Sequence, residues 1–260
     1  LLGEIGISCI ADSPEVGSNL QDHLDMTVSI CDKSRQSIGL SPVFLPRLIR
    51  AFYDYARHRR GFLASNVAEA GAFVNVGGGA RPDVQLHFIP AFLRDHGREL
   101  TPGFGCTVHV CQLRPRSRGY IRLQDKDPRN PPLIDPRYLS QKSDMQVLRE
   151  GVKLARRLFQ TDAFSAAFGG VDLPAATVTT DAQMDEDIRQ RAESIYHPVG
   201  TCRMGEDELA VVDSHLRVKG VSGLRVADAS VMPLLISGNT NAPSMMIGER
   251  AAGFMLGENS

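Results

Sequence analysis

The chain has 260 residues, of which 42% are hydrophobic and 23% charged, a composition typical of one large globular domain or two small ones. Its 29 Lys and Arg residues are balanced by 30 Asp and Glu, and the net charge of −1 excludes a dedicated nucleic-acid-binding protein. The longest apolar run, at residues 231–236, is far shorter than the ~20 residues of a spanning helix, so no transmembrane segment is expected.

The start of the chain and its cysteines bear on where the protein works. The first residues include no initiating Met and lack the basic start of a secretion signal, so we expect a piece of a longer chain. Five cysteines without a CxxC pair argue against a disulfide scaffold and a zinc site, and they favour the reducing cytoplasm. The seven histidines have no metal-ligand spacing, and no metal site is predicted.

The first predicted element is a helix at residues 43–60. Leu45, Ile49 and Phe52 share one apolar face with their neighbours, and five arginines add positive charge. Two interpretations remain open. The helix either forms a lid over a cavity, with its basic end in water, or lies on a membrane surface as a peripheral contact with the inner membrane. The first is favoured because amphipathic helices usually face their own core.

Short apolar runs predict strands at residues 70–76, 83–89, 106–113 and 119–123. Turn-rich segments such as GGGARP, rather than helices, join the middle strands, which favours an antiparallel sheet. We therefore predict an α+β fold with helices on one face of an antiparallel β-sheet.

Three further helices and one strand are predicted in the second half of the chain. The first helix runs over residues 143–159, with Ser143 and Gln146 as a capping box. A second begins at Thr180 with Gln183 at its third position, and it ends before Pro198. After a strand at 224–228, a helix at 242–256 has Asn241 as its N-cap, and its Met245, Met246, Ile247, Ala251 and Phe254 are expected to be mostly buried.

The segment IYHPVGTCRMG, at residues 195–205, holds the strongest candidate for chemistry. Proline restrains the residue that precedes it, so the imidazole of His197 lies on a stiffened backbone that suits a general base. The same residue could instead cap the end of a helix.

A polar loop at residues 228–241 lies between two apolar elements and directly before a helix N-terminus. It contains Asp228, Gly238, Asn239 and Asn241. The partial positive charge of a helix N-terminus could stabilise an anionic reduced flavin, although a capped core helix without ligand would have the same sequence.

Together these two segments resemble the C-terminal part of the glucose–methanol–choline (GMC) oxidoreductases. Four more segments in the family's order are similar to it: EVGSNLQDHL, SNVAEAGAFV, RPRSRGYIRL and DPRNPPLIDPRYL. The resemblance covers nearly the whole chain, and the upstream G-x-G-x-x-G unit of the family is missing from it.

The resemblance implies an FAD-dependent enzyme that oxidises an alcohol to a carbonyl compound. By this analogy His197 is the catalytic base, Asn241 bonds the same substrate oxygen, and a hydride passes to flavin N5. Asn239 competes with Asn241 for the amide role. The cofactor-binding residues would be Asn19, Asp228, Ala229, Asn239 and Thr240, and His23 would be structural.

The resemblance also implies how the chain divides. Residues 1–25 and 210–260 resemble returning segments of an FAD-binding domain, and residues 26–209 resemble a substrate-binding domain. Because the nucleotide-binding βαβ half is absent, we expect a fragment that is inactive alone and binds FAD weakly or not at all.

The substrate is an alcohol, and bacterial alcohol dehydrogenases of aliphatic or polyol substrates are the more similar members. Choline is the alternative, with Glu69 and Tyr196 as residues for its ammonium group. A second alternative is a non-catalytic binding or assembly module. The residues do not distinguish oxygen, a quinone and a carrier as the electron acceptor, and they do not set the oligomeric state.

Overall fold

The computed structural model describes residues 2–93, 95–166 and 177–257 and divides the chain into two compact units. Unit 1 comprises Leu1–His23, Leu113–Asp144 and Ser194–Ser260, and unit 2 comprises Leu24–Gln112 and Met145–Glu193. Both units are discontinuous in sequence. This division reflects which residues pack together and does not test function. The roles predicted for residues 1–25, 26–209 and 210–260 therefore stay predictions.

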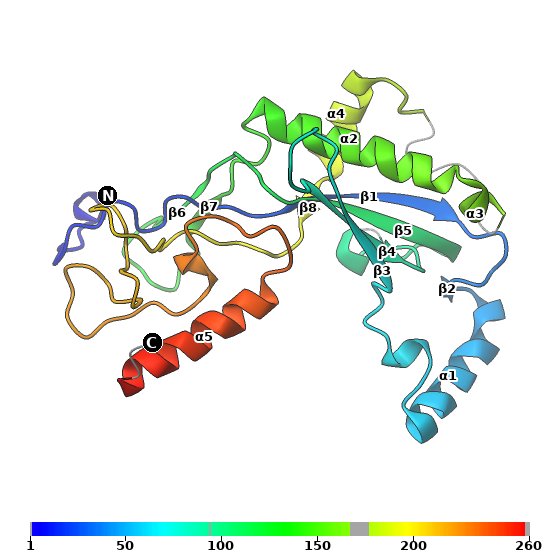
Figure 1. Cartoon of the computed structure of the whole chain (residues 1–260), viewed down its shortest axis with the longest axis horizontal. Coiled ribbons are helices and arrows are strands. Elements are labelled where there is room, and N and C mark those ends of the chain that lie inside the picture. The colour runs from blue at the N-terminus through cyan, green and yellow to red at the C-terminus, as the bar shows by residue number, and fades with distance from the viewer. Residues whose placement is uncertain (1, 94, 167–176, 258–260) are drawn as a thin grey trace. The chain divides into compact units, whose positions relative to one another are not determined.

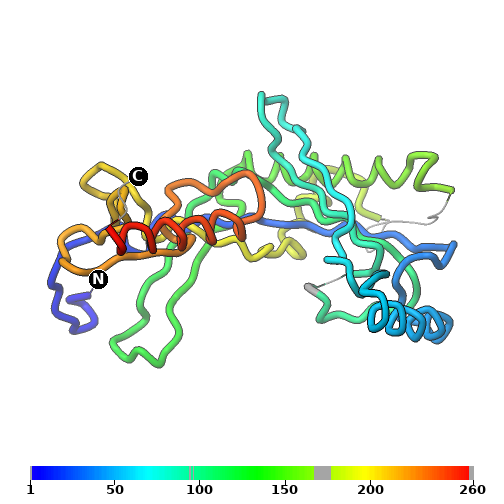
Figure 2. Tube along the Cα trace, turned by 60° about the horizontal axis from the view of Figure 1, so that its bottom comes forward, coloured from blue at the N-terminus to red at the C-terminus, as the bar shows by residue number. Residues whose placement is uncertain are grey.

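Unit 2 is built on an antiparallel sheet, as predicted, with strand order β3-β4-β5-β1-β8 (Figure 1). A further strand, β2, pairs with β5. The strands are β1 (Leu24–Cys31), β2 (Gly39–Leu40), β3 (Ala70–Val74), β4 (Val84–Ile89), β5 (Gly103–Gln112) and β8 (Glu193–Ser194). Figure 2 traces the β3–β4 hairpin in cyan as two neighbouring segments. The sheet ends at β8, whose Ser194 belongs to unit 1.

The strands predicted at 70–76, 83–89 and 106–113 are confirmed, but the predicted elements do not include β1. This strand pairs with β5 from Asp25 opposite Cys111 to Cys31 opposite Gly105. Its sequence, LDMTVSIC, alternates apolar and polar side chains and is typical of a strand, although six of its eight residues are buried.

The helix α2 (Lys142–Phe159) confirms the element predicted at 143–159. Its expected apolar face is buried: Met145, Leu148, Val152, Ala155 and Phe159. The capping box is wrong, because Ser143 lies inside a helix that begins at Lys142. The Asp144 carboxylate instead accepts hydrogen bonds from the backbone N–H groups of Arg116 and Ser117, at 2.9 and 2.8 Å.

Two other helices, α3 (Asp162–Ser165) and α4 (Asp181–Arg191), complete the second half of unit 2. The capping box predicted for α4 is confirmed, because the Thr180 side chain accepts from the Gln183 backbone and the Gln183 side chain accepts from the Thr180 backbone. Local sequence therefore set this helix start.

The predicted basic helix is α1 (Leu45–His58), and its apolar face does not pack into unit 2. Ala51 is buried, whereas Leu45, Ile49 and Phe52 are 54%, 62% and 59% exposed. The helix is anchored through the Arg47 guanidinium, which donates to the backbone oxygens of Arg35 and Gln36 at 2.8 and 2.7 Å.

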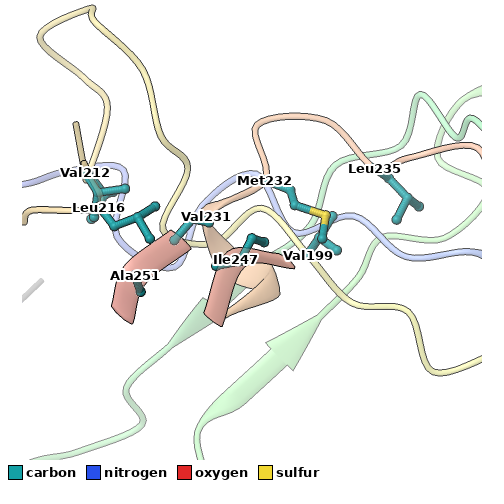
Figure 3. Packing of buried hydrophobic residues seen from close by; sticks show 9 residues of the cluster. Val199, Val212, Leu216, Val231, Met232, Leu235, Ile247 and Ala251 are labelled. Carbon is teal, nitrogen blue, oxygen red and sulfur yellow. The ribbon is translucent and has the colours of Figure 1, made fainter. Parts of the chain in front are cut away.

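Unit 1 contains the hairpin of β6 (Tyr120–Arg122) and β7 (Leu133–Asp135) and the helix α5 (Asn241–Leu256). Ile247 and Ala251 of α5 pack into an apolar cluster with loop residues, among them Val199 and Val231 (Figure 3). Much of this unit therefore consists of irregular segments held by one shared core.

Three details of unit 1 differ from prediction. Residues 224–228 are not a strand and make only an isolated bridge between Arg225 and Arg217. Thr240, not Asn241, is the N-cap of α5, and its side chain makes no capping hydrogen bond. Met245 and Met246 were expected to be mostly buried but are 63% and 54% exposed, because α5 packs through only one narrow side.

Short 3-10 helices complete the architecture, at Gly3–Ile5, Pro42–Phe44, Phe62–Ala64, Asp95–Gly97 and Ala229–Val231. Among the described helices, none is both long enough and apolar enough to span a bilayer.

Two helical glycines provide a matched test of packing. At Gly151 in α2, a Cβ atom would come within 2.6 Å of the Val110 side chain, whereas Gly248 in α5 has nothing within 4 Å of such an atom. We expect Gly151→Ala to lower the free energy of unfolding by about 1–3 kcal/mol through overpacking. Gly248→Ala should raise it by about 0.5–1 kcal/mol through helix propensity. Urea unfolding measures both, and shifts of the same sign would contradict this account of α2 packing.

Candidate active site

His197 lies in a segment that runs antiparallel to the NLQDH segment within unit 1. Gln21 and Val199 exchange two backbone hydrogen bonds of 3.0 and 2.8 Å, and the backbone N–H of Ile195 donates to the His23 oxygen at 3.1 Å. The backbone on either side of His197 is thereby held against residues 21–23.

The buried carboxylate of Asp22 fixes His197 more directly. One carboxylate oxygen accepts the backbone N–H of His197 at 2.9 Å. The other accepts the hydroxyl groups of Tyr138 and Ser194. Burial, together with the hydrogen bond to Asp22, raises the pKa of Tyr138, so its phenol stays protonated as a donor. The segment around Tyr138 and the segment 194–197 thus meet on the carboxylate of Asp22.

The side chain of His23 touches the imidazole of His197. Their Nδ1 atoms are 3.0 Å apart, and the rings meet edge-on with centroids 5.1 Å apart. The Nε2 atom of His23 lies 3.1 Å from the Leu113 carbonyl oxygen and 3.0 Å from that of Ile236. The pKa of His23 is lowered to about 4, first by burial and then by the nearby His197 ring.

Asn19 lies in a left-handed backbone conformation, with φ of 58°. Its amide donates to the carbonyl oxygens of Gly200 and Pro233, both at 3.2 Å. Gly200 itself has φ of 98° and adjoins the Asn19 backbone, so only glycine fits there without strain. This predicted cofactor residue ties together the segments that carry His197 and the polar loop.

The polar loop runs from Asp228 to α5. The Asp228 side chain accepts from the Ser230 backbone at 2.7 Å and starts the 3-10 helix Ala229–Val231. Asn239 is exposed, Thr240 is largely buried, and Asn241 is exposed as the first residue of α5. Because the Thr240 side chain does not cap the helix, the α5 N-terminus suits an anionic group. The residues therefore fit the expected flavin, whose reduced pyrimidine ring is anionic.

The two residues predicted for choline lie in different units. Tyr196 is exposed in unit 1, beside His197, in a left-handed conformation with φ of 64°. Glu69 is exposed in unit 2, directly before β3. Their joint action on one ammonium group stays a prediction.

Sequence reasoning missed the support of His197. Asp22, Tyr138 and Ser194 were not singled out, and His23 was assigned only a structural role. The signal lay in the adjacent Asp22 and His23 of the NLQDH segment, but their partners are separated from them by 90 residues or more. Within the described ranges, no three His, Cys, Asp or Glu side chains gather as metal ligands.

Comparison with known proteins identifies the family. A model described as GMC oxidoreductase matches residues 115–248, slightly more than half of the chain. An alcohol dehydrogenase [acceptor] of Pseudomonas putida is 48% identical over 96% of this chain, and an oxygen-dependent choline dehydrogenase of Brucella melitensis is 42% identical over 98%. The chain belongs to the GMC oxidoreductase family, as its sequence motifs predict.

Solved structures of similar fold agree with this assignment, and they show how much of each relative the chain covers. The model matches a formate oxidase of Aspergillus oryzae, studied for its FAD modification, with a TM-score of 0.89 and 26% identity over 99% of the chain. It matches a pyridoxine 4-oxidase with a TM-score of 0.81 and 26% identity. The chain spans about half the length of these relatives, 46–47% for the two dehydrogenases and 50% for the formate oxidase.

The lowered pKa of His23 predicts a pH-dependent stability. Between its folded value of about 4 and its ordinary value of 6.5, the unfolded chain binds more protons, so the free energy of unfolding falls as pH falls. The loss between pH 6.5 and 4.5 should be about 2 kcal/mol in urea unfolding.

His23→Gln, which does not titrate, should flatten this pH dependence. The buried His109 should not interfere. Burial opposes its protonation, but Asp25 outweighs burial and raises its pKa, so its contribution changes above pH 6.5. An equally steep loss in His23→Gln would contradict the assignment to His23.

Proposed function

We propose that this chain is the substrate-binding and catalytic part of an FAD-dependent oxidoreductase that converts an alcohol to an aldehyde or ketone. The observation that carries the proposal is the fixed imidazole of His197. Its backbone bonds Asp22, its ring contacts His23, and His23 in turn reaches Ile236 in the loop that leads to Asn241.

In this function, His197 accepts the proton of the substrate hydroxyl, and Asn241 bonds the same oxygen. Removing the proton raises the negative charge on the oxygen and makes the carbon-bound hydrogen a better hydride donor. The amide of Asn241 stabilises the developing alkoxide, with Asn239 as the alternative donor. FAD, when bound, supplies the acceptor for the hydride. Asn19, Asp228, Ala229, Asn239 and Thr240 are the residues of this chain proposed to hold it.

The division of labour follows from the same proposal. Residues 1–25 and 210–260 complete an FAD-binding domain, and residues 26–209 bind the substrate. Since the chain spans about half of its relatives, the pyrophosphate-binding half is supplied by further sequence, and the isolated chain retains FAD weakly or not at all.

An aliphatic or polyol alcohol is the proposed substrate, supported by the higher identity to the alcohol dehydrogenase than to the choline dehydrogenase. Choline is the competing substrate, with Glu69 and Tyr196 at its ammonium group. A non-catalytic binding module is the other alternative. The presence of both His197 and Asn241 favours catalysis, because such a module has no chemical need for the pair.

A version extended to the length of the relatives tests the proposal, with an artificial electron acceptor and with primary alcohols or choline. His197→Asn and Asn241→Ala should each lower kcat/KM about 10²- to 10⁴-fold, because one removes the base and the other a donor to the alkoxide. His58→Asn, at an exposed histidine of α1, is the control and should have no effect.

The outcomes separate the alternatives. Faster turnover of choline than of aliphatic alcohols, with a higher KM for choline in Glu69→Gln, would establish the competing substrate. Two results would contradict the proposed reaction. One is a flavin-loaded version that turns over no alcohol, and the other is full activity of the variant lacking both His197 and Asn241.

We also propose that α1 rests on an anionic membrane surface, at the cytoplasmic face of the inner membrane. The exposed Leu45, Ile49 and Phe52 would enter the apolar boundary of the lipid. The segment 45–60 carries five arginines against one aspartate, which complements anionic headgroups. A cytoplasmic location is supported by the odd number of cysteines, five, and by the lack of a CxxC pair among them.

Vesicle co-sedimentation tests the membrane proposal. The chain should bind phosphatidylglycerol vesicles more tightly than phosphatidylcholine vesicles, and salt should weaken the binding. Replacing both Ile49 and Phe52 with Gln should weaken it at least ~10-fold, because two large apolar side chains are no longer buried. Leu100→Gln, at a 74% exposed position elsewhere in unit 2, is the matched control. Equal binding by both variants, or none by the unmodified chain, would leave α1 as a lid.

A further inference from the structure

We propose that His23 is a positioning residue that fixes the tautomer of His197, leaving the lone pair of the His197 ring on Nε2. This proposal rests on the proposed function for the use of that lone pair, but the tautomer follows from geometry alone. It gives a role in the reaction to a residue whose sequence context predicted a structural one.

The argument starts at the far side of the His23 ring. Its Nε2 atom lies within 3.1 Å of two backbone carbonyl oxygens, those of Leu113 and Ile236. A carbonyl oxygen can only accept, so the proton of the His23 ring must be on Nε2. Placing the lone pair there would set it against two oxygen lone pairs in a site where His23 is completely buried.

The protonation of the other ring nitrogen of His23, Nδ1, follows by elimination. His23 is neutral around pH 7, since burial and the neighbouring His197 hold its pKa at about 4. A neutral imidazole carries one proton, and the carbonyl oxygens have placed it on Nε2. The Nδ1 atom of His23 is therefore an acceptor.

The partner of this acceptor is the Nδ1 atom of His197, 3.0 Å away. A hydrogen bond at that distance needs one proton between the two nitrogens, and His23 has none to offer there. His197 therefore donates from Nδ1, and in its neutral form the lone pair is on Nε2. That is the atom with which His197 can accept a proton as a base.

The two residues that fix His197 act at different atoms. Asp22 holds the backbone N–H of His197, and so places the residue, whereas His23 holds the ring and sets its proton. Once Nε2 has accepted a proton, the imidazolium continues to donate from Nδ1 to the neutral His23. The charged form is stabilised without a second proton transfer.

Nitrogen NMR of the chain labelled with ¹⁵N-histidine tests the tautomer directly, without flavin or turnover. Above pH 7, the signals of His197 should show a protonated Nδ1 and an unprotonated Nε2, and those of His23 the reverse. A scalar coupling across the hydrogen bond should connect the two Nδ1 nuclei. His23→Gln and His197→Asn assign the signals, and the exposed His58 serves as a reference without a fixed tautomer.

Two variants separate positioning from simple packing in the extended, flavin-loaded version. His23→Leu should lower kcat about 10- to 100-fold with little change in KM and move the acidic limb of the kcat/KM profile to lower pH, because the imidazolium loses its acceptor. His23→Gln, whose side-chain oxygen can accept from Nδ1, should restore much of kcat.

Each result has one meaning. A proton on Nε2 of His197 in the unmodified chain overturns the proposal, even if His23→Leu does not fold. Equal loss in the Gln and Leu variants overturns the positioning role. The predicted tautomer in a flavin-loaded version that turns over no alcohol refutes the proposed function and leaves the tautomer assignment intact.

Discussion

The buried carboxylate of Asp22 is the constraint on which the candidate site depends. It accepts a backbone N–H from His197 and hydroxyl protons from Tyr138 and Ser194, and so joins its own segment to the distant Tyr138 and to the segment 194–197. A buried carboxylate is costly unless its oxygens are hydrogen-bonded, so the three donors and the acceptor stabilise one another. The position of His197 is therefore a consequence of satisfying Asp22.

The adjacent residue, His23, contacts the ring of His197, and so bears on the protonation of that ring as well as on its position. Two backbone carbonyl oxygens set its proton, and its remaining nitrogen faces the ring of His197. A general base must be both placed and supplied with a lone pair, and the Asp22–His23 dipeptide provides one function through each side chain. The carbonyl of Ile236 further connects this pair to the loop that precedes Asn241.

Two exposed apolar surfaces lie outside the cores of the two units. Met245 and Met246 of α5 lie outside the core of unit 1, and the apolar face of α1 lies outside that of unit 2. The basic residues around α1 favour an anionic lipid surface for that helix. The exposed methionines of α5 lie instead on a helix that begins at the proposed cofactor loop.

The sequence alone determined the elements whose signals are local. The capping box of α4, the buried face of α2 and the alternating strand β4 each depend on residues within a few positions of one another. The sequence also identified the family, because the motifs of the family are short and contiguous. The same reasoning overlooked β1, whose alternating sequence is typical of a strand, and it failed for residues 224–228, which form only an isolated bridge through Arg225 and Arg217.

Only the tertiary structure decided how His197 is held and which of its nitrogens carries the proton. The partners of Asp22 and His23 come from residues 113, 138, 194, 197 and 236. No local sequence pattern predicts that these residues will be in contact. A tautomer depends on the direction of hydrogen bonds between such distant groups. The sequence could therefore single out His197 as the candidate base, but not the interactions that hold it in place.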